Sequence, residues 1–483
     1  MRALANWRFS RPWIQQSFSF IFGSRLDRFD SWSRTLRRTN GTNPNFTNAA
    51  NLIRERRYWN QAGQKLGEPP QIPGVTLDYL ATAISHQRKN LDYAQLASTS
   101  RFFHDRLAVM FGARRDDVTN SQQTTSGIPA AATTGLPQLG AVITPPGGSA
   151  PAPVVGAKSV GRFDPVSRNI GSVYFIRPWI GVFANYSETF AAPNNGANLI
   201  DGGAPDISQS KGKDFGVKLE LFEGRVAGSL SYYTSRQVKL LINGTRTTEI
   251  NRIWNNLNRV DLASLSYRDT QDQKGDGYEM DLTANPTRSL RLTFNLALPK
   301  TAAVNLEPGL LGYVAENIAA WQAGAAGSNN PNQVNNDLTT IRNYIASLTP
   351  GTPLNNTFQY TSNVYVTYTV PSGPLRTVAF GVGANIRGRS KIASVLNNAY
   401  EYRYADNYHV VAAHATYRYR FSKNLNARFQ LNISNVLDRD KLIYNTYSTY
   451  RVGGLAANPQ NQVPGTIRMP EPRKFTLSST FEF

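Results

Sequence analysis

Apolar and polar residues alternate with a period of two along many stretches of this chain, and this pattern constrains the fold most. Over residues 475–483, phenylalanine, leucine and one serine alternate with threonine, serine and glutamate. The same alternation runs over 427–433, 290–298 and 378–387. Successive residues of a β-strand point to opposite faces, so each stretch predicts a strand with one apolar face and one polar or small face. A β-sandwich and a β-barrel both show this periodicity.

The lengths of the connections favour the barrel. Turns of a few residues alternate strictly with long connections, as expected when short periplasmic turns lie on one rim and long extracellular loops on the other. The long connections cover roughly 24–91, 117–168, 191–212, 241–273, 300–356, 389–405 and 438–471. About fourteen strands are predicted, over 13–23, 92–102, 106–116, 169–177, 178–190, 213–222, 225–240, 274–285, 289–299, 357–370, 374–388, 406–421, 424–437 and 472–483.

Bulk properties are compatible with an all-β, transmembrane antiparallel β-barrel. No window approaches 18 consecutive apolar residues, which excludes a transmembrane helix. The mean hydropathy of −0.39 is low, but only alternate residues of a barrel strand face lipid. Several predicted strands reach the length of about 9–11 residues that a tilted membrane strand needs.

Two loop regions carry local signals. Leu338, Ile341, Ile345 and Leu348 have helical spacing, and 310–322 is compatible with a second helix, so we expect two short helices in the 300–356 loop. Residues 76–87 look extended, and we expect a hairpin within the first long loop without placing it.

Signatures of catalysis and metal binding are missing. The chain has no cysteine, and none of its four histidines has zinc-site spacing with a carboxylate. His409 and His414 fall on opposite faces of one predicted strand, which favours a structural or solvated role. Gly381, Gly383 and Gly388 do not fit a phosphate loop, and close packing on a strand is the better interpretation. We therefore predict no enzyme, no cofactor and no metal site.

Several motifs, in their order and spacing, resemble those of TonB-dependent outer-membrane receptors over roughly 92–483. Tyr186–Phe190 reads YSETF, Lys213–Glu220 forms a strand with glycine and acid, and Phe222–Arg225 resembles an F-x-G-R turn. Leu431–Asp438 is similar to the N-x-x-N-x-x-D pattern of the penultimate strand. Glu471-Pro472-Arg473 then precedes a last strand that ends in Phe483, which resembles the signal read by the barrel-assembly machinery.

The resemblance implies a receptor and transporter in the outer membrane of a Gram-negative-type bacterium, for a scarce solute such as a siderophore or another large nutrient. The family's barrels have 22 strands, an amino-terminal plug and a box that binds TonB. Neither the plug nor the box nor a signal peptide is visible, so we expect an amino-terminally truncated receptor that engages TonB only if a plug is present. We divide the chain into 1–91, with a first strand and a long basic loop, and 92–483, the barrel region.

Polar side chains on the predicted strands are candidates for the wall of the lumen, although none can be assigned a ligand. They share the face opposite the apolar rows. These lumen-facing candidates are Arg291, Asn385, Arg387, Arg428, Gln430 and Asn432.

Positive charge concentrates at the start of the chain. Residues 1–60 hold eleven arginines, no lysine and three acids, within a total net charge of +20. Contact with anionic lipopolysaccharide is favoured over nucleic-acid binding, because no nucleic-acid-binding motif accompanies the cluster. Attraction of an anionic substrate by Arg54, Arg56 and Arg57 is a third hypothesis.

Two other classes of protein stay open. A passive, porin-like barrel would need no energy coupling, and its conductance in a planar bilayer would not depend on TonB. A surface adhesive β protein would have no pore.

Overall fold

The structure is a computed structural model. It describes residues 1–38, 72–126, 154–155, 158–193, 198–263, 265–395, 398–422, 425–449, 462–464 and 466–482.

Antiparallel strands dominate the molecule and join in one 18-stranded sheet. Three of these strands are short pieces: β5 (Val154–Val155) and β6 (Ser159–Phe163) pair with β4, and β13 (Thr352–Pro353) pairs with β12. The other fifteen pair in chain order. They are β1 (Arg2–Arg11), β2 (Ile14–Arg38), β3 (Leu77–Phe102), β4 (Leu107–Ser126), β7 (Val166–Arg177), β8 (Ile180–Ala191), β9 (Ser208–Leu221), β10 (Val226–Asn243), β11 (Arg268–Ala284), β12 (Leu290–Val304), β14 (Thr361–Thr369), β15 (Val378–Arg387), β18 (Tyr408–Arg420), β19 (Asn426–Ser434) and β24 (Lys474–Glu482).

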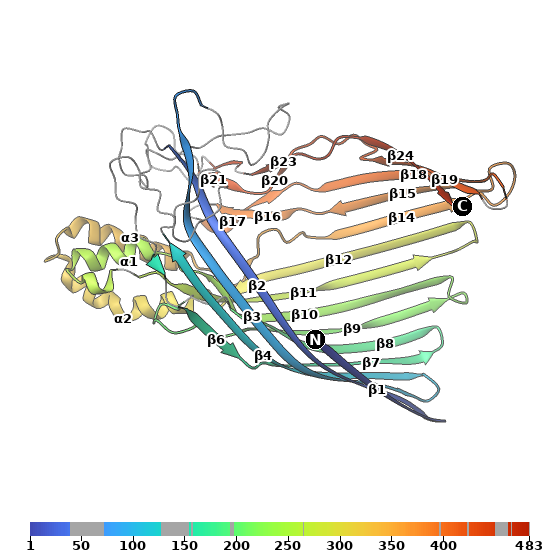
Figure 1. Ribbon diagram of the computed structural model, residues 1–483, viewed down its shortest axis with the longest axis horizontal. Helices are drawn as coiled ribbons and strands as arrows, with labels where there is room; N and C mark the ends of the chain where they lie inside the picture. The colour runs from blue at the N-terminus through green and yellow to red at the C-terminus, as the bar shows by residue number, and fades with distance from the viewer. Residues whose placement is uncertain are drawn as a thin grey trace.

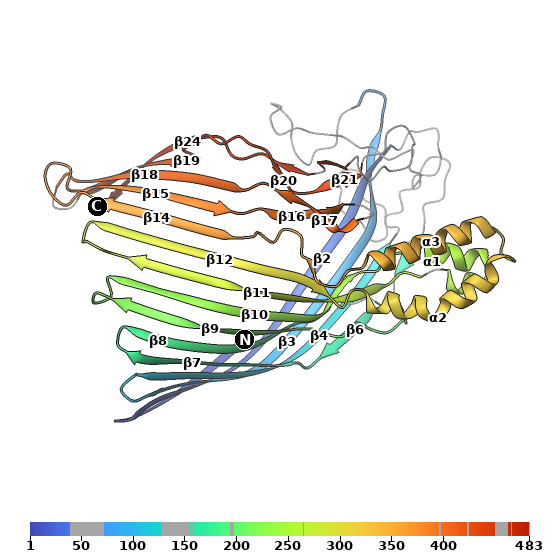
Figure 2. The same ribbon diagram turned by 180° about the vertical axis from the view of Figure 1, so that it is seen from behind.

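The sheet curls into a partial barrel. Figures 1 and 2 show β2, β3 and β4 on one wall of the partial barrel and β10, β11 and β12 on the opposite wall. The strands of the two walls run at an angle to each other. Within the described residues no backbone pairing joins β1 to β24, which are the two edges of the sheet. Three two-stranded sheets lie in the long connections: β16 (Ser390–Val395) with β17 (Asn398–Ala405), β20 (Ile443–Tyr444) with β23 (Ile467–Arg468), and β21 (Tyr447–Thr449) with β22 (Gln462–Pro464).

The two rims differ as the connection lengths predicted. Short turns gather at one rim, whereas the helices and the other described parts of the long connections gather at the opposite rim (Figure 1). The turn between β3 and β4 bends through three consecutive left-handed residues, Phe103, His104 and Asp105, at φ of 54°, 55° and 67°. Three non-glycine residues in that region are unusual, and they reverse the chain within a few residues.

All fourteen predicted stretches contain strands, but the first part of the chain departs from the prediction. The loop expected over 24–91 is shorter, because β2 runs to Arg38 and β3 begins at Leu77. Residues 76–87 form no hairpin of their own; they open β3 and pair with β2. β3 also runs through residues 91 and 92, where we divided the chain.

Strand β1 was missed entirely. Its Ala3, Ala5, Trp7 and Phe9 do alternate with more polar residues, but Leu4 and the arginines obscure the period. Pairing with β2 places Trp7 against Phe18, where the rings stack with centroids 5.6 Å apart.

Three helices and a 3₁₀ turn pack together at the long-loop rim and form what we call the helical cluster. They are α1 (Thr247–Asn256), η2 (Val260–Leu262), α2 (Pro308–Ala325) and α3 (Pro331–Ser347). The two helices predicted within 300–356 are confirmed, whereas α1 was not predicted. No helix in the described ranges combines the length and apolarity needed to cross a membrane.

The helical cluster holds a hydrophobic core of its own. Ile250, Ile253, Leu310, Trp321 and Ile341 are completely buried in it. The ring of Trp254 meets that of Trp321 edge-on with centroids 5.7 Å apart, and its indole nitrogen donates to the Tyr313 hydroxyl at 2.9 Å. Large aromatic side chains contribute most of the apolar area buried in such a small core.

Charged side chains hold the helices of the cluster together, and one of them attaches the cluster to the barrel. Asp269, on β11, accepts hydrogen bonds from the backbone nitrogens of Gly309 and Leu310 and so satisfies the first turn of α2. Arg252 of α1 contacts the buried Asp337 of α3 at 2.5 Å. The buried Glu307 accepts hydrogen bonds from the hydroxyls of Thr245 and Tyr344.

Replacing Trp321 with alanine should melt the helical cluster without disturbing the barrel. Truncating a fully buried tryptophan costs about 3–5 kcal/mol, which a core of this size cannot absorb. Hydrogen exchange should lose protection in α1–α3 and keep it in β10–β12. The control is Trp179→Ala, because Trp179 is 49% exposed at a short turn. Equal loss of protection in both variants would contradict an independent core.

The helical cluster should also lose stability at high pH. Burial, followed by the hydrogen bond to Glu307, raises the pKa of Tyr344 to about 12. The folded state therefore holds this proton more tightly than the unfolded state, whose tyrosine has a pKa of about 10. The stability that this pKa shift contributes is fully present below about pH 10 and falls as the pH rises towards 12. Limited proteolysis of α3 across this range should show the loss, and Tyr344→Phe should flatten the dependence.

Candidate functional site

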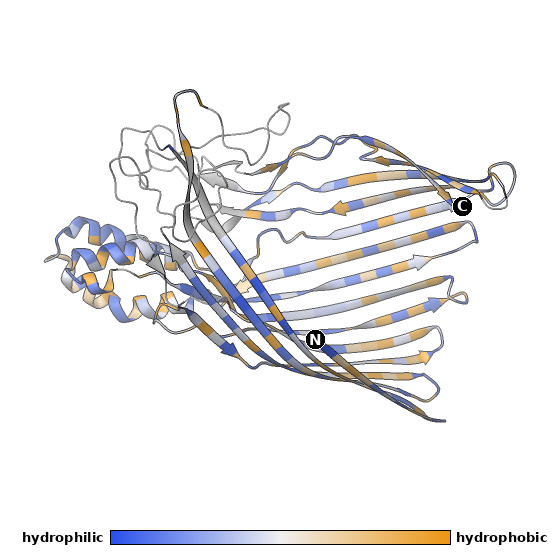
Figure 3. Cartoon of the chain, viewed as in Figure 1, coloured by the Kyte–Doolittle hydropathy of each residue, from blue (hydrophilic) through white to orange (hydrophobic). Residues whose placement is uncertain are grey.

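One face of the sheet carries an apolar band. An aromatic row marks the limit of this band towards the long-loop rim. Phe215, Tyr232 and Tyr278 lie opposite one another on β9–β11, with ring centroids 5.6 and 5.0 Å apart. Two residues nearer the long-loop rim, the same face carries Lys213 and Asp276. The polarity changes within one step of the pleat, as expected at a membrane interface. Figure 3 shows the alternation of hydropathy along these strands.

A second aromatic row lies near the short turns. Tyr417, Tyr419 and Phe421 follow one another on the same face of β18 and its turn, and the last two rings meet edge-on at 4.8 Å. Phe429 and Phe481 meet edge-on across β19 and β24 at 6.3 Å. Aromatic girdles at both interfaces are typical of outer-membrane barrels.

The opposite face is polar and carries a continuous row across six strands. Each residue of the row lies directly opposite the next. The row consists of Lys218, Ser229, Asp281, Asn295, Asn363 and Asn385, on β9, β10, β11, β12, β14 and β15.

The three asparagines of this row form a hydrogen-bonded ladder. The side-chain nitrogen of Asn363 donates to the Asn295 Oδ1 at 3.0 Å, and that of Asn385 donates to the Asn363 Oδ1 at 2.5 Å. Arg387 extends the ladder, because its Nε donates to the Asn385 Oδ1 at 3.2 Å. The amides fix one another's orientation and can still donate to and accept from a passing solute.

Two glycines on β15 make room for an aromatic pair on the polar face. The rings of Tyr365 and His414 stack with centroids 5.9 Å apart and planes 7° apart, and the Tyr365 hydroxyl lies 3.3 Å from the His414 Nδ1. A Cβ at Gly381 would lie 2.0 Å from the His414 ring, and one at Gly383 2.9 Å from Tyr365. The predicted close packing of glycine here is confirmed, as is the placement of His414 and His409 on opposite faces.

The six candidates for the lumen wall all fall on this polar face. Arg291 and Asn432 lie at the same level of the sheet. On the three strands between them, the residues in register at this level are Thr367, Gly381 and His414. Gln430 donates to the Asn432 Oδ1 at 2.8 Å, and Arg428 lies two residues farther along β19. That this face lines an aqueous interior stays a prediction. Phe483, the expected assembly signal, lies outside the described residues.

Sequence reasoning missed several residues of this face, namely Asp281, Asn295, Asn363 and Tyr365. Each lies at a polar position of a predicted strand, so the alternation contained the signal. The missing information was the register, which decides which polar positions on neighbouring strands become partners.

The second asparagine of the N-x-x-N-x-x-D pattern explains the motif. Asn435 is buried in a left-handed conformation just after β19. Its side-chain nitrogen donates to the carbonyls of Arg439 and Glu471, both at 2.9 Å. Asp438 pairs with Arg473 at 3.4 Å. The motif therefore joins the exit of β19 to the entry of β24.

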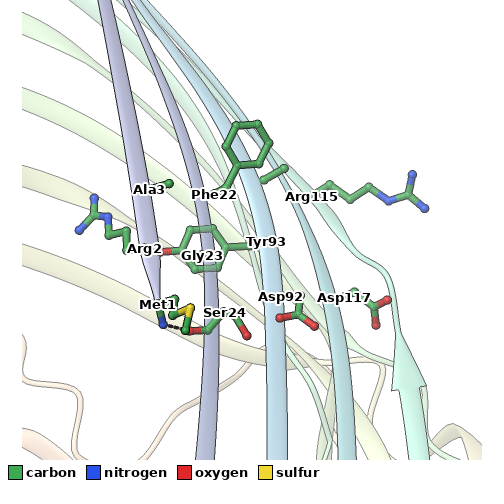
Figure 4. A pocket seen from close by; sticks show the side chains of 11 residues that line it. Met1, Arg2, Ala3, Phe22, Gly23, Ser24, Asp92, Tyr93, Arg115 and Asp117 are labelled. Atoms are coloured by element: carbon green, nitrogen blue, oxygen red, sulfur yellow. Dashed lines mark hydrogen bonds between the residues drawn. The ribbon is translucent and has the colours of Figure 1, made fainter.

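A hollow of about 890 Å³ lies where edge strand β1 meets β2 and β3 (Figure 4). The Met1 ammonium donates to the Ser24 carbonyl at 2.8 Å, and the ring of Tyr93 fills the space over Gly23. Phe22 and Ala94, which line it, alternate with the residues of the polar face. Its apolar wall thus belongs to the lipid-facing side, separate from the polar row.

Comparison with known proteins decides the family. The family model for the "TonB dependent receptor-like, beta-barrel" matches residues 2–436. This chain belongs to the TonB-dependent receptor family. Members are transport receptors of the outer membrane of Gram-negative bacteria, and this TonB-dependent receptor is an outer-membrane β-barrel protein.

Curated and solved relatives match with low identity. The metal-pseudopaline receptor CntO of Pseudomonas aeruginosa is 27% identical over 124 residues, covering 26% of this receptor and 15% of CntO. The ferric-catecholate import receptor Fiu of E. coli K12 is 13% identical with a TM-score of 0.60, covering 100% of this chain and 54% of Fiu. The ferric preacinetobactin receptor BauA of Acinetobacter baumannii is 14% identical with a TM-score of 0.58, covering 100% and 54%. The receptor spans about half the length of these solved structures.

Thiol labelling tests the two faces, because the chain has no cysteine of its own. Gln430 and Leu431 are neighbours on β19 but point to opposite faces. A charged, water-soluble thiol reagent should modify the Gln430→Cys receptor in lipid vesicles and spare the Leu431→Cys receptor. If the reagent modified both variants at the same rate, or only Leu431→Cys, the assignment of faces would be wrong.

Proposed function

We propose that this receptor takes up a large, scarce solute across the outer membrane, and that the solute is a siderophore-like metal chelate. The observation that carries the proposal is the asparagine ladder on the polar face, at a height between the two aromatic rows of the opposite face. A chelate that carries carbonyl, hydroxyl and amide groups can exchange hydrogen bonds with Asn295, Asn363 and Asn385 as it passes.

The names of the relatives support the class of solute. Fiu is described as a ferric-catecholate import receptor, BauA as a ferric preacinetobactin receptor and CntO as a metal-pseudopaline receptor. All three handle a metal bound to an organic chelator. We assign the same class of solute to this receptor, because its polar face presents amides and arginines that can contact such a solute.

The helical cluster provides the outer part of the proposed route. It stands at the long-loop rim, at the end of the same β10, β11 and β12 that carry the polar row (Figure 2). A solute arriving from outside the cell would meet this cluster and the neighbouring loops before it reached the ladder. We propose that Arg291, Arg387, Arg428, Gln430 and Asn432 line the route with the ladder.

The partners follow from the same proposal. Energy coupling would come through TonB acting on a plug, and folding would use the barrel-assembly machinery with Phe483 as its signal. Lipopolysaccharide would surround the long-loop rim. Arg54, Arg56 and Arg57, the hypothetical attractors of an anionic substrate, lie outside the described residues.

Uptake of a ⁵⁵Fe-labelled ferric catecholate tests the function. Cells without other catecholate receptors should gain uptake when they produce this receptor, and the gain should vanish without TonB. Asn363→Leu should reduce uptake about tenfold or more, because it removes both hydrogen bonds of the middle rung and places leucine in a polar row. Val364→Leu, one residue away on the apolar face, is the matched control.

Three results would count against the proposal. Uptake that persists without TonB would favour a passive, porin-like barrel. Equal loss in Asn363→Leu and Val364→Leu would deny the ladder a role. Absence of uptake for both a ferric catecholate and a metal-pseudopaline complex, with receptor present in the outer membrane, would exclude these chelates as solutes.

A further inference from the structure

Four arginines gather at the short-turn end of the polar face, far from the asparagine ladder. A cavity of about 570 Å³ is lined by Arg376 of the β14–β15 turn, Arg418 and Arg420 at the end of β18, and Arg428 at the start of β19. Glu482 is the one carboxylate among its lining residues. The lining therefore carries an excess of positive charge.

Two of these arginines lie directly opposite each other on neighbouring strands. Arg418 and Arg428 are partners in the register of β18 and β19, which places their Cβ atoms about 5 Å apart on one face. Like charges in directly opposed positions repel and destabilise a strand pair. Both side chains are exposed, and neither makes an ion pair within the residues that the structure describes.

Another arginine of the same face shows the usual arrangement. Arg114 on β4 grips the fully buried Asp116 through its Nε at 2.9 Å and its Nη2 at 2.6 Å. The guanidinium of Arg114 also lies over the Tyr93 ring, 3.8 Å from its centroid. Arg418 and Arg428 have no such carboxylate directly opposite them. On β24, the residue opposite Arg428 is Thr480. On the other side, the pairing of β18 with β15 ends one residue before Arg418, where Tyr417 lies opposite Val378.

We propose that Arg376, Arg418, Arg420 and Arg428 form a binding site for an oxyanion, a phosphate or carboxylate group, at the short-turn mouth of the polar face. Guanidinium groups present forked donors that match the paired oxygens of such anions. A bound anion would cancel the repulsion between Arg418 and Arg428. The Nε of Arg420 donates to the Ser422 carbonyl at 3.0 Å, which holds the start of that side chain beside the cavity.

The phosphate group could come from a dissolved anion or from a lipid headgroup near the rim. Both sources present the same phosphate group to the arginines, so two preparations of the protein are needed to distinguish a dissolved anion from a headgroup. One is the purified full chain in an uncharged detergent, titrated with inorganic pyrophosphate by calorimetry at low salt. The other is the chain in nanodiscs of phosphatidylcholine with or without phosphatidylglycerol.

The titration should show saturable binding of pyrophosphate by the native chain. Arg418→Gln and Arg428→Gln should each weaken it about tenfold, as expected for the loss of a charge-assisted contact, and the double variant should abolish it. Arg428→Lys should bind with intermediate affinity, because lysine keeps the charge and loses the fork. The matched control is Arg288→Gln, at another short turn outside the cavity.

Unfolding gives a second measurement that does not depend on the heat of binding. Pyrophosphate should raise the unfolding midpoint of the native chain and of Arg288→Gln, and leave that of the double variant unchanged. The double variant should fold at least as well as the native chain without anion, because it removes an opposed pair of like charges.

Binding of pyrophosphate in detergent would assign the site to a dissolved anion. A rise of the unfolding midpoint only in nanodiscs that contain phosphatidylglycerol would assign it to a headgroup. Absence of binding in both preparations would overturn the proposal. A loss in Arg288→Gln as large as that in Arg428→Gln would also overturn it, since binding would then reflect overall charge.

Discussion

The ladder of backbone hydrogen bonds between neighbouring strands is the constraint on which the rest of this structure depends. Inside a bilayer no water is available to unpaired backbone groups, and each one left without a partner costs several kcal/mol. The ladder also fixes the register, and the register decides which side chains meet lipid and which meet one another on the polar face.

A side chain compensates for one irregularity in the ladder. β10 contains a bulge between Gln237 and Leu240, beyond the aromatic row at Tyr232 and towards the long-loop rim. Lys239 in this bulge is left-handed, at φ 55°, and its backbone nitrogen donates to the Asp272 carboxylate at 3.0 Å. A side chain thus replaces the carbonyl that the neighbouring strand would otherwise supply.

The alternation of residue types predicted fourteen strands and their apolar and polar faces, and the lengths of the connections predicted the two rims, because these features depend only on neighbours in sequence. It could not predict the asparagine ladder or the pairing of Tyr365 with His414, since both depend on partners tens of residues away. Strand β1 escaped because its arginines and Leu4 disturbed the pattern. Helix α1 escaped because only Ile250, Ile253 and Trp254 of its ten residues form its buried side.

The helical cluster has a mechanical consequence for the mouth of the barrel. It joins the connection between β10 and β11 to the connection between β12 and β14, because Arg252 of the first grips Asp337 of the second and Asp269 holds the start of α2. Neither connection can swing alone without breaking these contacts. We therefore expect the two connections to move together as one unit rather than independently of each other.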